Sequence, residues 1–175
     1  MEAILARIMG LSESGAPGRV HGGVILRLCD EAAGVAAARH SHARVVTAGV
    51  DRVSFLTPVY VGEMLTVHAR VNAVWRTSTE VGVRVTAEPP DTGGVRHVLT
   101  AYFTMVAVDA DGAPTEMPPL PASVADTDPQ AQRREREANV RREGRLAERE
   151  ALIRDARREA GQQDAPERAA EEEKE

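Results

Sequence analysis

Residues 20–42, VHGGVILRLCDEAAGVAAARHSH, are the stretch that decides how this chain folds. They are almost all small or apolar, two glycines stand near their start, and Asp30 and Glu31 interrupt them in the middle. A run of this length and composition predicts a helix from residue 22 to about residue 40, with one face small enough to lie close to a sheet. An aspartate on such a helix requires a physical explanation.

The two acidic residues point in different directions when residues are placed about 100° apart around the helix axis. Asp30 shares its face with glycines, an alanine and a leucine, which is the face able to approach a sheet, whereas Glu31 lies one turn after Arg27, its expected salt partner. Partial desolvation there raises the pKa of a carboxylate and makes it a stronger base when it is ionised. The sequence leaves open that Asp30 lies at the edge of the buried face and reaches water or a backbone amide.

The first 122 residues also carry the patterns of several strands. Strict alternation of apolar and polar side chains from residue 64 onward is typical of a half-buried strand. The segments predicted to be strands are residues 4–9, 45–56, 64–75, 80–87 and 98–108. Residues 12–18, SESGAPG, are expected to be a loop. The resulting order, β-α-β-β-β-β, predicts an α+β fold in which one long helix packs against a single antiparallel sheet.

Charge divides the chain into a nearly neutral body and a charged tail. Residues 126–175 hold 27 charged side chains, whereas residues 1–125 hold 10 basic and 12 acidic ones. A balanced body lacks the basic stripe of a nucleic-acid-binding protein, and we expect no nucleic-acid partner. The tail is helix-forming from Pro129 onward but has only a thin apolar stripe, so we expect a charged helical tail with a disordered end.

The composition also predicts where the protein works. No 18 consecutive residues are uninterruptedly apolar, so we expect no membrane span, and the first ten residues lack the pattern of a secretory signal. A single cysteine, Cys29, excludes an intramolecular disulfide and is consistent with a reducing compartment. We therefore expect a cytoplasmic protein.

The start of the predicted helix suggests a chemistry for Asp30. The first N–H groups of a helix lack intrahelical acceptors and carry the positive end of its dipole, and here they belong to Gly22 and Gly23. A carboxylate acting as general base, combined with free N–H donors for a developing oxyanion, suits attack on an acyl carbonyl.

Three segments in order, GRVHGGVILRLCDEAAGVAAARH, RVVTAGVDRVSFLTPVYVGE and VWRTSTEV, resemble the hotdog-fold acyl-CoA thioesterases of the brain acyl-CoA hydrolase type. The resemblance runs from about residue 6 to residue 120. It implies a single hotdog domain, residues 1–122, in which a curved antiparallel sheet wraps a long central helix, followed by the charged tail, residues 123–175. It also implies hydrolysis of acyl-CoA to a fatty acid and CoA, with no metal and no cofactor.

The resemblance assigns roles to residues of this sequence. It implies that Asp30 is the carboxylate that activates water, and that Gly22 and Gly23 hold the thioester carbonyl through backbone N–H groups. The residues that it places against acyl-CoA are His21, Thr47, Ser54, Arg76, Thr77 and Ser78, with CoA lying along residues 47–54 and the turn at 76–78. Sites of this family lie between two hotdog units, which implies a homodimer that assembles further to a homohexamer.

One departure from the family pattern keeps alternatives open. Many members carry an asparagine three residues before the position of Gly18, and this sequence has Gly15 there. Ser12 and Ser14 are possible substitutes. The rivals to the thioesterase are a non-catalytic acyl-CoA-binding or assembly protein and an acyl-thioester hydratase or dehydratase, which would pair the carboxylate with a histidine in the helix region. His40 and His42 have no accompanying ligand cluster for a metal, and Cys29 has no evident histidine partner for covalent catalysis.

Overall fold

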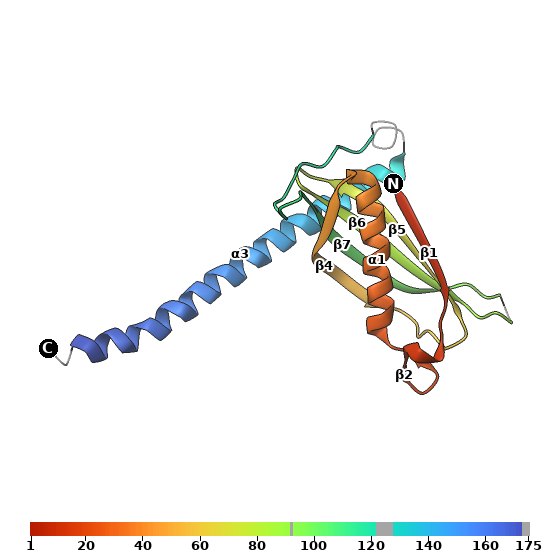
Figure 1. The fold of residues 1–175 in the computed structure, drawn as a ribbon, viewed down its shortest axis with the longest axis horizontal. Helices are drawn as coiled ribbons and strands as arrows, with labels where there is room; N and C mark the ends of the chain where they lie inside the picture. The colour runs from red at the N-terminus through yellow and green to blue at the C-terminus, as the bar shows by residue number, and fades with distance from the viewer. Residues whose placement is uncertain (92, 122–127, 173–175) are drawn as a thin grey trace. The chain divides into compact units, whose positions relative to one another are not determined.

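The computed structural model describes residues 1–91, 93–121 and 128–172 (Figure 1). The chain divides into two compact units, Met1–Glu135 and Arg136–Glu175, which are described separately. The elements are β1 (Glu2–Ile8), a 3₁₀ turn η1 (Leu11–Glu13), β2 (Ser14–Ala16), β3 (Arg19–Val20), α1 (Gly22–Ser41), β4 (Arg44–Phe55), β5 (Met64–Val74), β6 (Ser78–Glu88), β7 (Arg96–Val108) and α3 (Pro129–Glu172).

The predicted α+β architecture is confirmed. Five antiparallel strands form one sheet in the order β1-β5-β6-β7-β4, and α1 lies across one face of it (Figure 1). Strands β1 and β4 are therefore its two edges. The predicted loop at residues 12–18 is more ordered than expected, because η1 and β2 lie in it and β2 pairs with β3 as a small second sheet.

The core lies between α1 and the inward face of the sheet. Strands β5, β6 and β7 each bury alternate aliphatic side chains toward the helix, which confirms the period-two pattern. The side of α1 that faces the sheet carries small residues, among them the fully buried Ala33 and Ala36. The helix axis can therefore lie close to the strands. Larger buried side chains such as Leu28, 2% exposed, each contribute about 1.5–3 kcal/mol.

Strand β4 is irregular where it passes α1. Its register with β7 shifts between Thr47 and Gly49 and again between Asp51 and Ser54. Arg52, between the second pair, has a φ of 47°, a left-handed conformation that is uncommon for a residue with a side chain. Such bulges re-aim neighbouring side chains and are frequent beside functional sites.

The first turns of α3 belong to the first unit. Asp128 accepts a hydrogen bond from the N–H of Gln130 at 2.9 Å, and this bond is the main cause of its lowered pKa. Ala131 is buried and lines a hollow of about 310 Å³ together with Met1 and Asn72. The predicted domain boundary at 122/123 lies outside the residues that the structure describes, so it stays a prediction.

Candidate active site

Asp30 is held against β4 by a single strong contact. The hydroxyl of Thr47 donates a hydrogen bond of 2.5 Å to Asp30 Oδ1. A short bond to an ionised acceptor is of the charge-assisted kind, which fixes both groups. One carboxylate oxygen is thereby occupied, and among the described residues no hydrogen bond engages the other. Thr47 is a predicted substrate contact, but its hydrogen bond to Asp30 could not be predicted, because two residues 17 positions apart on different elements carry no signal of contact.

The expected burial of Asp30 is not found within one chain. The buried side of α1 runs through Ile25, Cys29, Ala32 and Ala36, while Asp30 lies on the exposed flank that faces β4. The physical reason is that the side of α1 that packs on the sheet is centred on alanines such as Ala32 and Ala36, and the glycines that share the face of Asp30 lie at its margin. In this chain the Asp30 side chain is therefore open to solvent.

The neighbour of Asp30 behaves as predicted. Glu31 accepts a hydrogen bond of 2.6 Å from Arg27 one turn earlier, and both side chains are about half exposed. An exposed pair of this kind contributes little to stability. Glu31 is consequently a surface residue and a suitable control for Asp30.

An apolar hollow of about 390 Å³ opens beside Asp30, between α1 and β4. Its lining is Gly23, Leu26, Arg27, Asp30, Val50, Val53 and Phe103. Asp30 and Arg27 are the charged members of this set. A carboxylate at the rim of an apolar hollow can act on a polar group whose hydrocarbon neighbours lie inside the hollow.

The start of α1 offers one free backbone donor and not two. His21 caps the helix, and its Nδ1 accepts the N–H of Gly23 at 2.9 Å. The N–H of Gly22 has no partner among the described residues. The expectation that both glycines present free N–H groups therefore holds for Gly22 and fails for Gly23 in this structure, because a histidine can cap a helix through its ring nitrogen.

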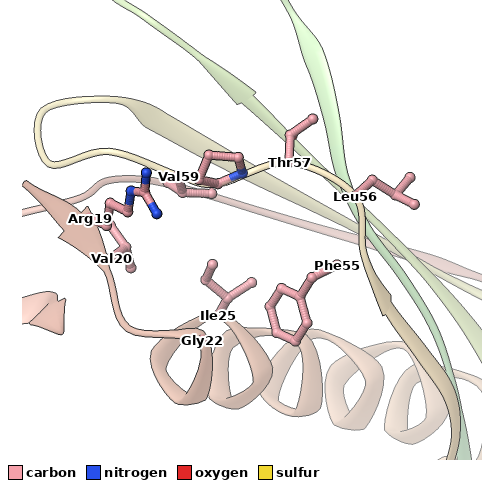
Figure 2. Close-up of a pocket in the computed structure, with 9 residues that line it drawn as sticks. Arg19, Val20, Gly22, Ile25, Phe55, Leu56, Thr57 and Val59 are labelled. Carbon is pink, nitrogen blue, oxygen red and sulfur yellow. The ribbon is translucent and has the colours of Figure 1, made fainter. Parts of the chain in front are cut away.

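A second hollow, of about 310 Å³, adjoins the free N–H of Gly22 (Figure 2). Figure 2 shows the ring of Phe55 directed at the first turn of α1, with Ile25 beside it and Arg19 across the opening. A side chain on Gly22 would lie 3.3 Å from the ring of Phe55, so the glycine lets the ring approach the helix. The lining is otherwise largely aliphatic.

The remaining predicted residues are divided between the two ends of β4 and α1. Ser54 is exposed, pairs with Thr100 and precedes Phe55, so it lies near the start of α1. The turn at residues 76–78 lies at the opposite end, where the N–H of Met117 donates to the carbonyl of Arg76 and His40 Nε2 contacts the carbonyl of Pro118. One chain thus brings Asp30 and Thr47 together and keeps the turn at residues 76–78 away from Gly22.

Cys29, His40 and His42, the candidates for covalent catalysis or metal binding, occupy structural positions. Burial, and to a lesser extent the charge of Asp30, raises the pKa of the Cys29 thiol to about 12, so it stays protonated near neutral pH. His40 is buried, and His42 ends α1 with a left-handed backbone. In the described ranges no group of three His, Cys, Asp or Glu side chains could hold a metal ion. Within the same ranges, no helix has both the length and the apolar character that crossing a bilayer requires.

Comparison with known proteins identifies the family. Residues 17–93 match the model of the thioesterase superfamily. Protein VdlD of Helicobacter pylori is 44% identical over 99 residues, which are 57% of this chain and 56% of VdlD. An uncharacterised acyl-CoA thioester hydrolase of Zymomonas mobilis is 39% identical over 115 residues, 62% of this chain and 73% of that protein.

Solved structures agree with these relatives. A hexameric acyl-CoA thioesterase in its apo form has a TM-score of 0.78 and 31% identity, and the match covers 84% of this chain and 92% of that one. An acyl-CoA hydrolase of Staphylococcus aureus, solved with one aspartate replaced by alanine, has a TM-score of 0.75 and 28% identity over 85% of this chain and 88% of its own. The same hydrolase has been solved with butyryl-CoA and CoA.

The fold and these matches define a hotdog-fold protein of the thioesterase class. The chain belongs to the thioesterase superfamily. It spans a little over half of the length of VdlD, the relative with the highest identity given above.

Proposed function

We propose that this chain is an acyl-CoA thioesterase whose active sites form between two protomers, with Asp30 as the general base. The observation that carries the proposal is the Asp30 carboxylate, held by Thr47 at the rim of an apolar hollow. The arrangement fits a substrate that joins a long hydrocarbon chain to a reactive carbonyl, which is what an acyl thioester is.

The roles of Asp30 and Thr47 gain support from the Staphylococcus aureus hydrolase. Alanine variants of that enzyme replace an asparagine, an aspartate and a threonine that stand 15 and 17 residues apart, which is the spacing of Gly15, Asp30 and Thr47 here. In our proposal Thr47 is a positioning residue. Its hydroxyl fixes Oδ1, and Oδ2 accepts a proton from water.

The proposed oxyanion donor is the N–H of Gly22, and it cannot serve the Asp30 of its own chain. The two residues are eight positions apart on α1, which corresponds to about 12 Å along the axis. A base and an oxyanion donor that act on one carbonyl must both lie within hydrogen-bond reach of the water or the oxygen that they serve. Two chains with antiparallel α1 helices can bring Asp30 of one protomer to Gly22 of the other.

The surface of the chain supports such an assembly. Strand β4 is a 12-residue edge strand, and it carries exposed apolar side chains at Val46, Val50, Val53 and Phe55. An uncovered apolar edge is an association hazard unless a partner pairs with it. We propose a homodimer built on this edge that assembles to a homohexamer, and two related thioesterases of solved structure are hexameric.

The reaction then follows from the groups present. Asp30 removes a proton from water as the water oxygen attacks the thioester carbon, and the carbonyl oxygen becomes an oxyanion that the N–H of Gly22 stabilises. The tetrahedral intermediate collapses, the carbon–sulfur bond breaks, and CoA leaves as a thiolate that takes up the proton. The products are a fatty acid and CoA.

The parts of the substrate have separate proposed positions. The acyl chain occupies apolar space between α1 and β4, and residues 47–54, with the exposed Ser54, lie along the pantetheine arm. The nucleotide end of CoA reaches the turn of Arg76, Thr77 and Ser78, where the exposed guanidinium of Arg76 can bind phosphate oxygens. We place the enzyme in the cytoplasm, where a lone thiol such as Cys29 stays reduced.

A turnover screen tests the proposal. The full chain is incubated with saturated acyl-CoAs of graded chain length, and release of the CoA thiol is measured. Steady release with at least one chain length is expected. The missing side chain at Gly15 favours the non-catalytic acyl-CoA-binding protein as the second candidate, and tight binding of acyl-CoA without release of thiol would establish that candidate instead.

A further inference from the structure

We propose that the imidazole of His21 supplies to the site the polar N–H that an asparagine at position 15 would otherwise offer. This inference rests on the proposed thioesterase function. Gly15 aligns by spacing with the asparagine replaced in the Staphylococcus aureus variant, so the amide of that asparagine is missing here. His21 Nε2 would donate a hydrogen bond to the thioester carbonyl oxygen.

His21 leaves no room for a side chain at position 15. A Cβ built on Gly15 would lie 2.9 Å from Cβ and 3.0 Å from Cδ2 of His21, closer than real side chains approach. No side chain therefore fits at position 15 while His21 stays where it is. The imidazole itself occupies the adjoining space, since Nε2 is bonded to Cδ2.

The loop that carries both residues is well anchored. The N–H of His21 donates to the carbonyl of Glu13 at 2.8 Å. The buried carboxylate of Glu13 accepts hydrogen bonds from Arg7 and from the N–H of Gly10, the latter at 2.5 Å. Because the loop is fixed at these points, the glycine at position 15 and the histidine at position 21 belong to one arrangement.

The hydrogen bond that His21 accepts sets the direction of its ring. Its Nδ1 accepts the N–H of Gly23 at 2.9 Å, and a nitrogen that accepts carries no proton. The neutral ring therefore carries its proton on Nε2. His21 is exposed, and Nε2 has no partner among the described residues. The result is a fixed, unused N–H donor one residue before Gly22.

A fixed N–H donor beside the thioester favours the transition state over the substrate. The carbonyl oxygen gains negative charge as water attacks, and a pre-positioned N–H stabilises that charge more strongly than it stabilises the substrate. An imidazole N–H and an amide N–H are both neutral donors, so one can replace the other. His21 forms no covalent bond and keeps its proton throughout the reaction.

Two substitutions separate this role from helix capping. In His21→Asn the side-chain oxygen stands near the place of Nδ1 and still caps Gly23, but nothing reaches the place of Nε2. In His21→Gln the amide reaches the place of Nε2, but the cap is lost. We expect H21N to keep its melting temperature and to lose about 10²-fold in kcat with little change in KM, whereas H21Q melts lower and keeps kcat within about tenfold of the original chain.

The controls make each outcome decisive. His42→Asn changes an exposed histidine at the other end of α1, in a left-handed position that asparagine tolerates, and should leave kcat unchanged. H21N with unimpaired kcat, or H21Q impaired as strongly as H21N, would overturn the proposal for His21 alone. A full chain without turnover on any acyl-CoA would overturn the proposed function, and this inference with it.

Discussion

Replacing Asp30 by Asn removes the proposed base and leaves its surroundings intact. The asparagine oxygen can still accept the hydroxyl of Thr47 in the 2.5 Å geometry, and only the group that takes a proton is lost. General-base catalysis contributes about 10²–10⁴ in rate, or about 3–5 kcal/mol of transition-state stabilisation. We therefore expect kcat on acyl-CoA to fall at least about 10²-fold while KM changes little.

The assay is thiol release from a good acyl-CoA substrate, with CoA binding and melting temperature measured on the same preparations. Glu31→Gln is the matched control, because Glu31 is adjacent in sequence but pairs with Arg27 on the surface. Its kcat should stay within about twofold, since exposed ion pairs contribute little. Near-normal turnover by Asp30→Asn, or an equal loss in both variants, would refute Asp30 as the base.

Further predictions follow from the same contacts. Thr47→Val keeps the shape of the side chain and removes the hydroxyl that positions Asp30, so kcat should fall about fivefold to tenfold. The effect is modest because a hydrogen bond to an exposed carboxylate contributes less free energy than one to a buried carboxylate. Cys29, fully buried and with its pKa raised to about 12, should resist thiol reagents in the folded protein near pH 7 and react only after denaturation; rapid labelling of the native chain would contradict its burial. A chain ending at Glu135 should match the full chain in turnover and melting temperature. A chain ending at Leu120 loses the packing of Ala131, and its melting temperature should fall by about 2–4 °C for each kcal/mol of stability lost. Equal melting temperatures of the two shortened chains would show that the start of α3 does not stabilise the domain.

Most of the fold could be predicted because two patterns, one for strands and one for a helix, are clear in this sequence. The alternation in β5 and β6 and the run of small residues in α1 both follow from which side must face the core. The small β2–β3 sheet could not be predicted, since two- and three-residue strands are too short for a pattern. The bulges of β4 and the left-handed Arg52 also lack a sequence signal.

The site was less predictable than the fold, for reasons of distance and assembly. The place of Asp30 on α1 predicts it as the base, whereas its contact with Thr47 depends on how β4 crosses the helix. The capping of Gly23 by His21 is a local choice of rotamer, which spacing does not reveal. The expected burial of Asp30 is wrong for this chain, because helical spacing predicts which residues share a face but not how far the sheet extends over that face.

The central claim is that Asp30 and Gly22 of different protomers act on one carbonyl, and mixed oligomers test it most directly. Gly22→Pro deletes the N–H at the first helical position, where proline is tolerated, and His21 already has the extended backbone that precedes proline. Gly22→Ala is the control, because it has the same first side-chain atom against Phe55 and keeps the N–H. We expect G22P and D30N each to be nearly inactive and G22A to retain most of its turnover.

The decisive measurement is the turnover of G22P and D30N chains that are assembled together in equal amounts. A mixed pair contains one site with an intact Asp30 from one chain and an intact Gly22 from the other, so random pairing should restore roughly a quarter of the original activity. If both groups acted within one chain, every site would lack one of them. Mixed oligomers no more active than the two variants measured separately would therefore contradict the account.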